Sequence, residues 1–154
     1  MELHTAIVGM STLIALAAIF NHSRNARRQT TANLVIQQRN DASLKQARTL
    51  VTVLNQKNEI TKLAHNDAKG SDQRNAVLAV LNNYEFIATG LREGAFDLQL
   101  YKRMTYSTVV NDWKALKPFI FDLRRQVERE TIFQEFQWLA EKFSYQPLKT
   151  DHRV

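Results

Sequence analysis

Three carboxylates in apolar surroundings are the side chains of this sequence best suited to acid–base chemistry: Glu85, Asp97 and Asp112. A general acid and a general base must lie close together with perturbed pKa values, and the spacing of these three residues does not establish that. We expect structural roles instead. Glu85 would pair with an arginine or with Trp113, Asp97 would start a helix, and Asp112 would pair with a nearby lysine or arginine.

Metal and nucleophile chemistry find no support in the residue pattern. The sequence has no cysteine. Its four histidines are His4, His22, His65 and His152. No two of them are three or four residues apart, which is the spacing that metal ligands on one helix need. Neither a glycine-rich phosphate loop nor a serine-centred nucleophile turn is present. We therefore expect no enzymatic activity, no catalytic residue, no metal and no cofactor.

The positive charge of the chain is concentrated in its first half. The formal net charge is +6. Residues 1–69 hold 9 basic and 4 acidic side chains, whereas residues 70–154 hold 12 and 11. Aromatic and basic residues between Trp113 and Arg125 could grip nucleic acid, but helical periodicity would turn the aromatic side chains inward and the basic ones outward. This distribution favours anionic lipid over nucleic acid as the partner of the charge.

A long apolar run precedes the basic residues. Leu3 to Phe20 carries no charge apart from any protonated fraction of His4, and it would span roughly 27 Å as a helix, close to the ~30 Å core of a bilayer. The cluster that follows is Arg24, Arg27 and Arg28. This pattern predicts a transmembrane anchor over residues 1–23, with the three arginines at the cytoplasmic membrane interface and the N-terminus outside.

Two other interpretations of the run are a cleaved signal peptide and a buried core helix. A signal peptide begins with basic residues, but the only charged side chain before the run is Glu2. A core helix seldom lacks charge on every face for five turns. Within the run, Ser11 and Ala15 form a small-xxx-small pair that could seat a second helix.

Residues 24–69 are predicted to form a long helical connector. No glycine or proline occurs from Ser11 to Lys69, and cap signals near residues 40–43 and 55–58 would interrupt the helix. The apolar spacing supplies about two heptads, fewer than a coiled coil needs. An amphipathic helix packed on the same chain and a self-associating coiled-coil stalk both remain open.

Residues 70–145 are predicted to form a compact cytoplasmic helical bundle, followed by a flexible tail over residues 146–154. Gly70 would end the connector, and Ser71 or Asp72 would cap the next helix. Lys117–Pro118 would end one helix, and Pro118 would start the next. A capping box, Thr131-x-x-Gln134, would begin the last helix. The predicted class is all-α.

Residues 76–143 resemble a bacterial and phage family known as domain of unknown function 4760. The resemblance is carried by these residues: Leu81 to Ala88 (LNNYEFIA), Gly90, Gly94, Asp97, Trp113, Pro118 to Ile120, Arg124, and Phe136 with Leu139. It implies a helical cytoplasmic domain behind an N-terminal hydrophobic segment, and it implies no activity. It also draws attention to Glu85 and Trp113 as a shared buried polar contact.

Together these observations predict a single-pass protein of the bacterial inner membrane. Its cytoplasmic domain would bind protein, either a second copy of itself or another partner, and its arginines would contact membrane lipid. A second hypothesis is a phage- or defence-related effector, or a superinfection-exclusion factor, that acts by oligomerising in the membrane. Nucleic-acid binding ranks below both.

Overall fold

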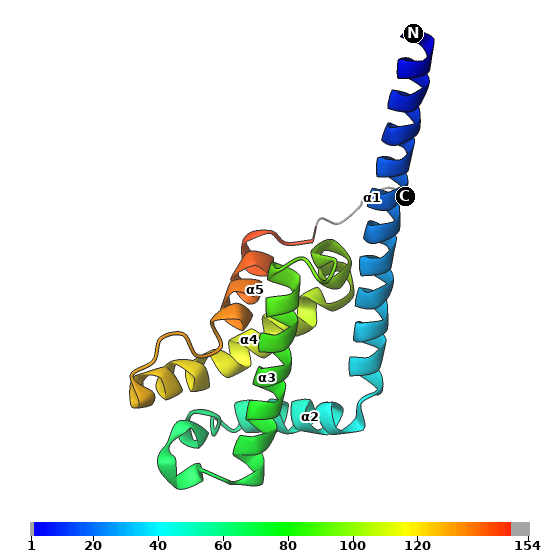
Figure 1. Ribbon diagram of the computed structural model, residues 1–154. Coiled ribbons are helices and arrows are strands. Elements are labelled where there is room, and N and C mark those ends of the chain that lie inside the picture. Colours follow the sequence, from blue (N-terminus) through cyan, green and yellow to red (C-terminus); the bar gives the residue numbers. More distant parts are fainter. Residues whose placement is uncertain (1, 149–154) are drawn as a thin grey trace.

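The computed structural model describes residues 2–148, with side chains from Leu16 onward, and every regular element in this range is helical (Figure 1). The predicted all-α class is confirmed for these residues. The helices and two short 3₁₀ turns are α1 (Glu2–Asn40), α2 (Ala42–Gln56), η1 (Thr61–Ala64), η2 (Asn66–Ala68), α3 (Asp72–Arg92), α4 (Leu98–Val127) and α5 (Gln134–Tyr145).

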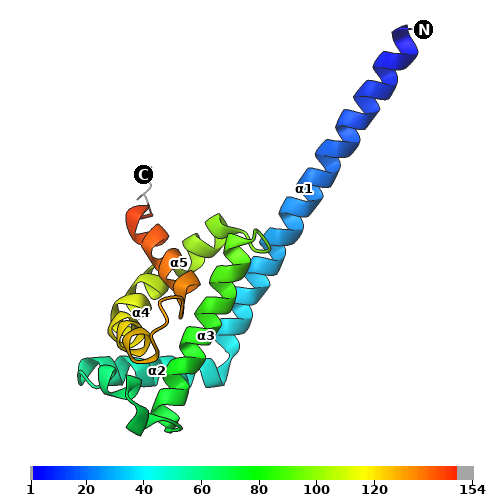
Figure 2. The same cartoon turned by 60° about the vertical axis from the view of Figure 1, so that its left-hand side comes forward.

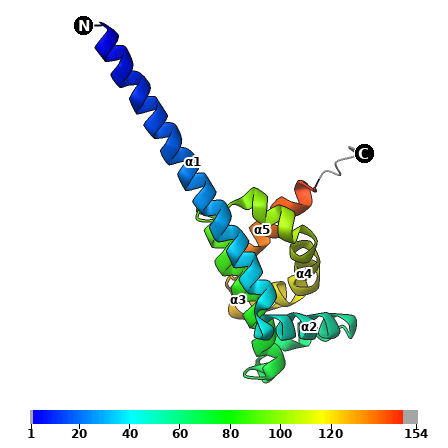
Figure 3. The same cartoon turned by 90° about the vertical axis from the view of Figure 1, so that its right-hand side faces the viewer.

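Four helices and the end of a fifth build the body of the molecule. α3 packs between α2 and α5, α5 also contacts α4, and η1 closes one end of α4. The C-terminal part of α1 lies against α4 and meets α2. Its N-terminal half extends away from the body as a single straight helix, which all three views show (Figures 1, 2 and 3).

The helix boundaries follow the cap residues of the sequence. The side chain of Asp41 accepts from the Leu44 amide and separates α2 from α1. Ser71 caps α3 after Gly70, whose φ of 84° is a left-handed conformation that suits glycine. Asp97 caps α4 through the Leu100 amide. The helix starts predicted at Ser71 and Asp97 are confirmed.

One hydrophobic core joins all five helices. Its centre is Tyr84 of α3, whose ring stacks on Phe136 of α5 with centroids 4.2 Å apart. Val35 of α1 and Val51 of α2 belong to the same core and are almost completely buried. Residues 31–69 therefore pack on their own chain, as the amphipathic-helix alternative expected.

Two predicted boundaries near the C-terminus are wrong. α4 continues through Pro118 to Val127, because Trp113 and Leu116 before the proline and Phe119 after it are buried along one stripe. The capping box does not form either, since the N-cap of α5 is Phe133 in a left-handed conformation with no side-chain cap of its own.

The predicted transmembrane anchor is contradicted. In the part of the chain that the structure describes, no helix combines the length and the apolar character needed to cross a membrane. Beyond Leu16, the apolar part of α1 ends at Phe20, and every residue from there to Thr30 is exposed. The inner-membrane location and the single-pass topology are corrected with it. The pair Ser11 and Ala15 lies outside the residues whose side chains are described.

Candidate functional site

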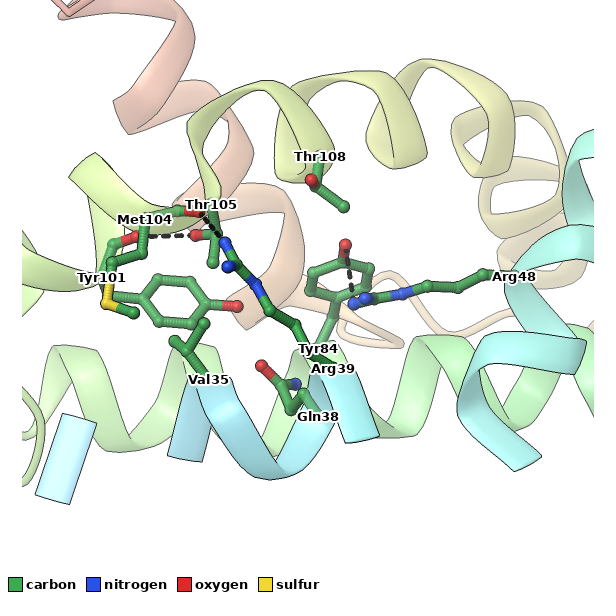
Figure 4. A pocket seen from close by; sticks show the side chains of 9 residues that line it. All are labelled: Val35, Gln38, Arg39, Arg48, Tyr84, Tyr101, Met104, Thr105 and Thr108. Atoms are coloured by element: carbon green, nitrogen blue, oxygen red, sulfur yellow. Dashed lines mark hydrogen bonds between the residues drawn. The ribbon is translucent and has the colours of Figure 1, made fainter. Parts of the chain in front are cut away.

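A small cavity lies where α1, α2, α3 and α4 meet, and its volume is about 90 Å³ (Figure 4). Most of its polar lining comes from helices that are far apart in the sequence. α1 contributes Gln38 and Arg39, α2 contributes Arg48, α3 contributes Tyr84, and α4 contributes Tyr101. Gln38, Tyr84 and Tyr101 are buried, Arg48 is half-buried, and Arg39 reaches the cavity from an exposed position.

Two of the lining residues, Arg48 and Tyr84, form a chain of three polar side chains with Asp112. The Tyr84 hydroxyl donates to Asp112 Oδ2 at 2.6 Å and accepts from Arg48 Nη2 at 3.1 Å. Arg48 Nε lies 3.5 Å from the same carboxylate oxygen, and the guanidinium is 5.2 Å from the centre of the Tyr84 ring. The chain links α2, α3 and α4. The predicted pairing of Asp112 with a basic residue is present, and that residue is Arg48.

Burial is the main influence on the pKa values of Tyr84, Asp112 and Tyr101. It raises the pKa of the Tyr84 hydroxyl well above its usual value, and the negative charge of Asp112 raises that pKa further. Burial also raises the pKa of Asp112, although the Tyr84 hydrogen bond and the Arg48 charge act in the opposite direction. The Tyr101 hydroxyl is similarly shielded, and burial raises its pKa to about 12. Both phenols therefore stay protonated at neutral pH, and the Tyr84 hydroxyl acts as a hydrogen-bond donor.

Two buried donors at the cavity have no hydrogen-bond partner among the described residues: Gln38 Nε2 and Arg48 Nε. Gln38 is only 9% exposed. Arg39 uses one of its nitrogens, Nη2, to donate to the Met104 carbonyl at 3.1 Å. The cavity is thus bordered by two guanidinium groups and by amide and phenol donors, with no carboxylate among its lining residues. Such a surface can bind an acceptor group.

Glu85 lies elsewhere, at the joint between α3 and α5. Its carboxylate accepts from the Phe136 amide at 2.9 Å and from the Glu135 amide at 3.3 Å. These amides belong to the first turn of α5, where backbone donors have no partner within the helix. Glu85 is therefore the cap of a helix that starts 49 residues further along the chain. Arg92 holds the same joint through both carboxylate oxygens of Glu135, each at 2.9 Å.

Trp113 contacts the side chain of Phe136. Its ring meets the Phe136 ring edge-on, with centroids 5.2 Å apart and planes at 88°. No hydrogen bond joins Glu85 to Trp113 among the described residues. The two residues singled out by the resemblance instead converge on Phe136, one through its backbone amide and the other through its ring.

The arginines predicted at the membrane interface have another setting. Arg27 Nη1 points to the Gly94 carbonyl at 3.4 Å, in the turn between α3 and α4. Three residues beyond the cluster, the buried Thr31 hydroxyl donates to the Arg27 carbonyl at 2.7 Å and accepts from the Asp97 amide at 2.8 Å. These bonds dock α1 onto the start of α4. Arg24 and Arg28 are exposed.

Sequence reasoning missed Gln38, Arg39, Arg48 and Tyr84 as site residues. The sequence offered one signal for Arg48. It directly follows Ala47, which belongs to the buried stripe of α2, and a charged residue at the edge of such a stripe needs a partner. The role of the Tyr84 hydroxyl depends on the positions of α2 and α4, because its partners Arg48 and Asp112 lie on those helices. Within the described residues, no group of three histidine or acidic side chains could hold a metal ion.

Comparison with known proteins identifies the family. No curated protein and no solved structure matches the chain. The family model for the "Domain of unknown function (DUF4760)" matches residues 5–143, which include the Tyr84–Asp112 pair, the Glu85 cap and the α1 residues that dock on the bundle. The chain belongs to this family.

Proposed function

We propose that this protein is a protein-interaction module that associates with a second copy of itself through the projecting part of α1. The observation that carries the proposal is the exposure of residues 16–30, every one of which is exposed although three of them are large and apolar. The exposed fractions are 53% for Leu16, 64% for Ile19 and 77% for Phe20. The segment stands clear of the body in Figures 2 and 3.

The apolar side chains continue the face by which α1 packs on its own bundle. Thr31 and Gln38 on that face are buried. Moving toward the N-terminus from these two residues, steps of four or seven residues reach Arg27, Phe20 and Leu16. Such steps return to the same side of a helix, so these residues share one side of α1 with Thr31 and Gln38. The same stripe is therefore covered near the bundle and uncovered beyond it. A partner helix that lies along the projecting segment would extend the existing packing.

Physical chemistry favours such a partner over a free helix. A short isolated helix is only marginally stable in water, and fully burying a leucine, isoleucine or phenylalanine side chain contributes roughly 1.5–3 kcal/mol. Leu16, Ile19 and Phe20 have i, i+3, i+4 spacing and form one patch. Ala17 and Ala18 beside them are small enough to let a second helix approach closely.

A second copy fits this segment in an antiparallel arrangement. Arg24 and Arg28 follow the apolar patch directly and are exposed. Parallel helices in register would place these charges beside their counterparts, whereas antiparallel helices would separate them and leave the apolar patches in contact. A symmetric pair uses the same surface on both copies. The hypothesis of an effector that oligomerises within a membrane depended on the contradicted anchor and is not carried forward.

Sedimentation equilibrium of the full chain over a concentration series tests the proposal. The wild type should dimerise, and the double variant Ile19→Glu, Phe20→Glu should sediment as a monomer, because two charges per copy would have to be buried. The matched control is Val127→Glu, which changes a 52% exposed apolar residue at the far end of α4 and should dimerise like the wild type. A monomeric wild type, or a double variant that still dimerises, would refute the proposal.

A further inference from the structure

We propose that the cavity between α1, α2, α3 and α4 is a binding site for a small oxyanion, held between Arg39 and Arg48 and hydrogen-bonded by the Gln38 amide. Nothing in the self-association of α1 requires this site. The inference rests on the cavity, on the charges that line it and on the buried Gln38 amide, which no group of the described chain satisfies.

The charge at the cavity selects an anion. Arg39 and Arg48 are its charged lining residues, and both are positive. Asp112 is paired with Arg48 but is not part of the lining, and its Oδ2 already accepts from Tyr84. An anion in the cavity would meet two guanidinium groups, one of them shared with Asp112, and no carboxylate of the lining. Guanidinium groups are also the side chains best suited to the oxygens of phosphate and carboxylate.

The unsatisfied donors point to a ligand that accepts hydrogen bonds. Buried polar groups are nearly always hydrogen-bonded, because leaving one without a partner costs free energy. Gln38 Nε2 is buried and without a partner among the described residues, whereas Arg48 Nε makes no hydrogen bond there but lies 3.5 Å from Asp112 Oδ2. The Tyr101 hydroxyl also lines the cavity and can add a second donor, because burial keeps it protonated at neutral pH. The Gln38 amide and the Tyr101 hydroxyl, together with two guanidinium groups, match the several acceptor oxygens of an oxyanion.

The size of the cavity limits the ligand. About 90 Å³ corresponds to the room of roughly three water molecules. Inorganic phosphate or a short carboxylate such as acetate fits this space, whereas a nucleotide or a peptide would fit only by one terminal group. The shared chemistry of the ligand is therefore a compact group with two or more negative or partly negative oxygens.

Binding would strengthen the attachment of α1 to the bundle. The ligand would touch α1 through Gln38 and Arg39, α2 through Arg48 and α4 through Tyr101. A ligand that binds the folded state alone stabilises it. At about ten times the Kd, the thermal midpoint of a chain of this size should rise by roughly 3–6 °C.

Thermal unfolding of the full chain tests the site, with inorganic phosphate and acetate titrated separately against sodium chloride at matched ionic strength. We expect a saturable rise in Tm with one or both oxyanions, and isothermal titration calorimetry should give one site per chain. A response to phosphate alone would identify a phosphate group as the ligand, and a response to acetate alone would identify a carboxylate. A Tm that follows only ionic strength would overturn the proposal.

Two variants distinguish a binding site from an imperfectly packed cavity. Gln38→Leu removes the unsatisfied amide, so its Tm without ligand should equal or exceed that of the wild type, yet its response to the oxyanion should fall at least tenfold in affinity. Arg39→Gln should lose the response as well. Arg103→Gln, which changes an exposed arginine on α4 outside the cavity, should respond like the wild type. Unchanged affinity in Gln38→Leu and Arg39→Gln would overturn the proposal.

Discussion

At the scale of single residues, the buried polar side chains of this protein hold helices together. Asp112, Tyr84 and Arg48 come from three helices and form one continuous interaction. Glu85 performs the same task for α3 and α5 by capping the start of α5. The carboxylates that could be suspected of acid–base chemistry are thus bonded to partners within the protein. Their partners explain why acidic groups occur on otherwise apolar helix faces.

The titration of Asp112 makes the stability of the protein depend on pH. Burial raises its pKa in the folded state above the ordinary 3.8, so between these two pKa values the folded protein binds a proton that the unfolded chain has released. Stability from this group therefore falls as the pH rises from 3.8 through the folded pKa and is constant above it. The free energy of unfolding of the wild type minus that of Asp112→Asn should show this fall.

Urea unfolding at a series of pH values measures that difference, and other carboxyl groups cancel from it because both proteins contain them. The same measurement on the Tyr84→Phe variant, with and without Asp112→Asn, provides a second comparison. Tyr84→Phe removes the hydrogen bond that lowers the pKa of Asp112, so the fall in the stability contributed by Asp112 should extend to higher pH. A difference that grows with pH over the same range would mean that pairing with Arg48 outweighs burial.

At the scale of elements, packing decides where helices continue, and α4 is the clearest case. Pro118 lies inside the helix and is exposed, so its ring removes a backbone hydrogen bond without contributing to the core. The buried stripe on both sides of it keeps the helix intact. Gly90 shows the opposite situation, because the ring of Phe96 occupies the place where a Cβ would lie.

Replacing Pro118 with alanine should stabilise the protein. The change restores a backbone donor in the middle of α4 and removes a residue that costs about 3 kcal/mol in a helix interior, so we expect a gain of roughly 1–3 kcal/mol in the free energy of unfolding. Chemical denaturation measures it, with Lys114→Ala as a control at an exposed position of the same helix. A loss of stability would show that the bundle depends on the shape the proline imposes.

At the scale of the whole molecule, the chain combines a packed bundle with one helix that extends beyond it. The connection between the two parts is the contact of α1 with α4, where Thr31 is completely buried and bonded to the Asp97 amide. From this contact the projecting segment extends away from the bundle (Figure 3). Self-association through α1 and ligand binding at the cavity both involve this helix, so a change in its docking should affect both.

Thr31→Val tests the docking of α1. Valine keeps the shape of threonine but leaves the Asp97 amide and the start of α4 without their bond, which should cost roughly 1–3 kcal/mol. Hydrogen exchange should quicken in residues 31–40 and at Asp97 while the α3 core stays protected. Thr30→Val, at the exposed neighbouring position, should exchange like the wild type. Faster exchange throughout the bundle would instead indicate that α1 is part of a single cooperative unit.

The sequence by itself determined the all-α class, the family and the helix starts at Ser71 and Asp97, because caps, glycine and the 3.6-residue period act over a few neighbouring residues. Only the tertiary structure decided that α4 passes through Pro118, that Glu85 caps α5, and that Gln38, Arg39 and Arg48 meet at one cavity. Each of these depends on contacts between residues distant in the chain. A local pattern records what a segment can form, whereas burial against other segments selects which of those possibilities is stable.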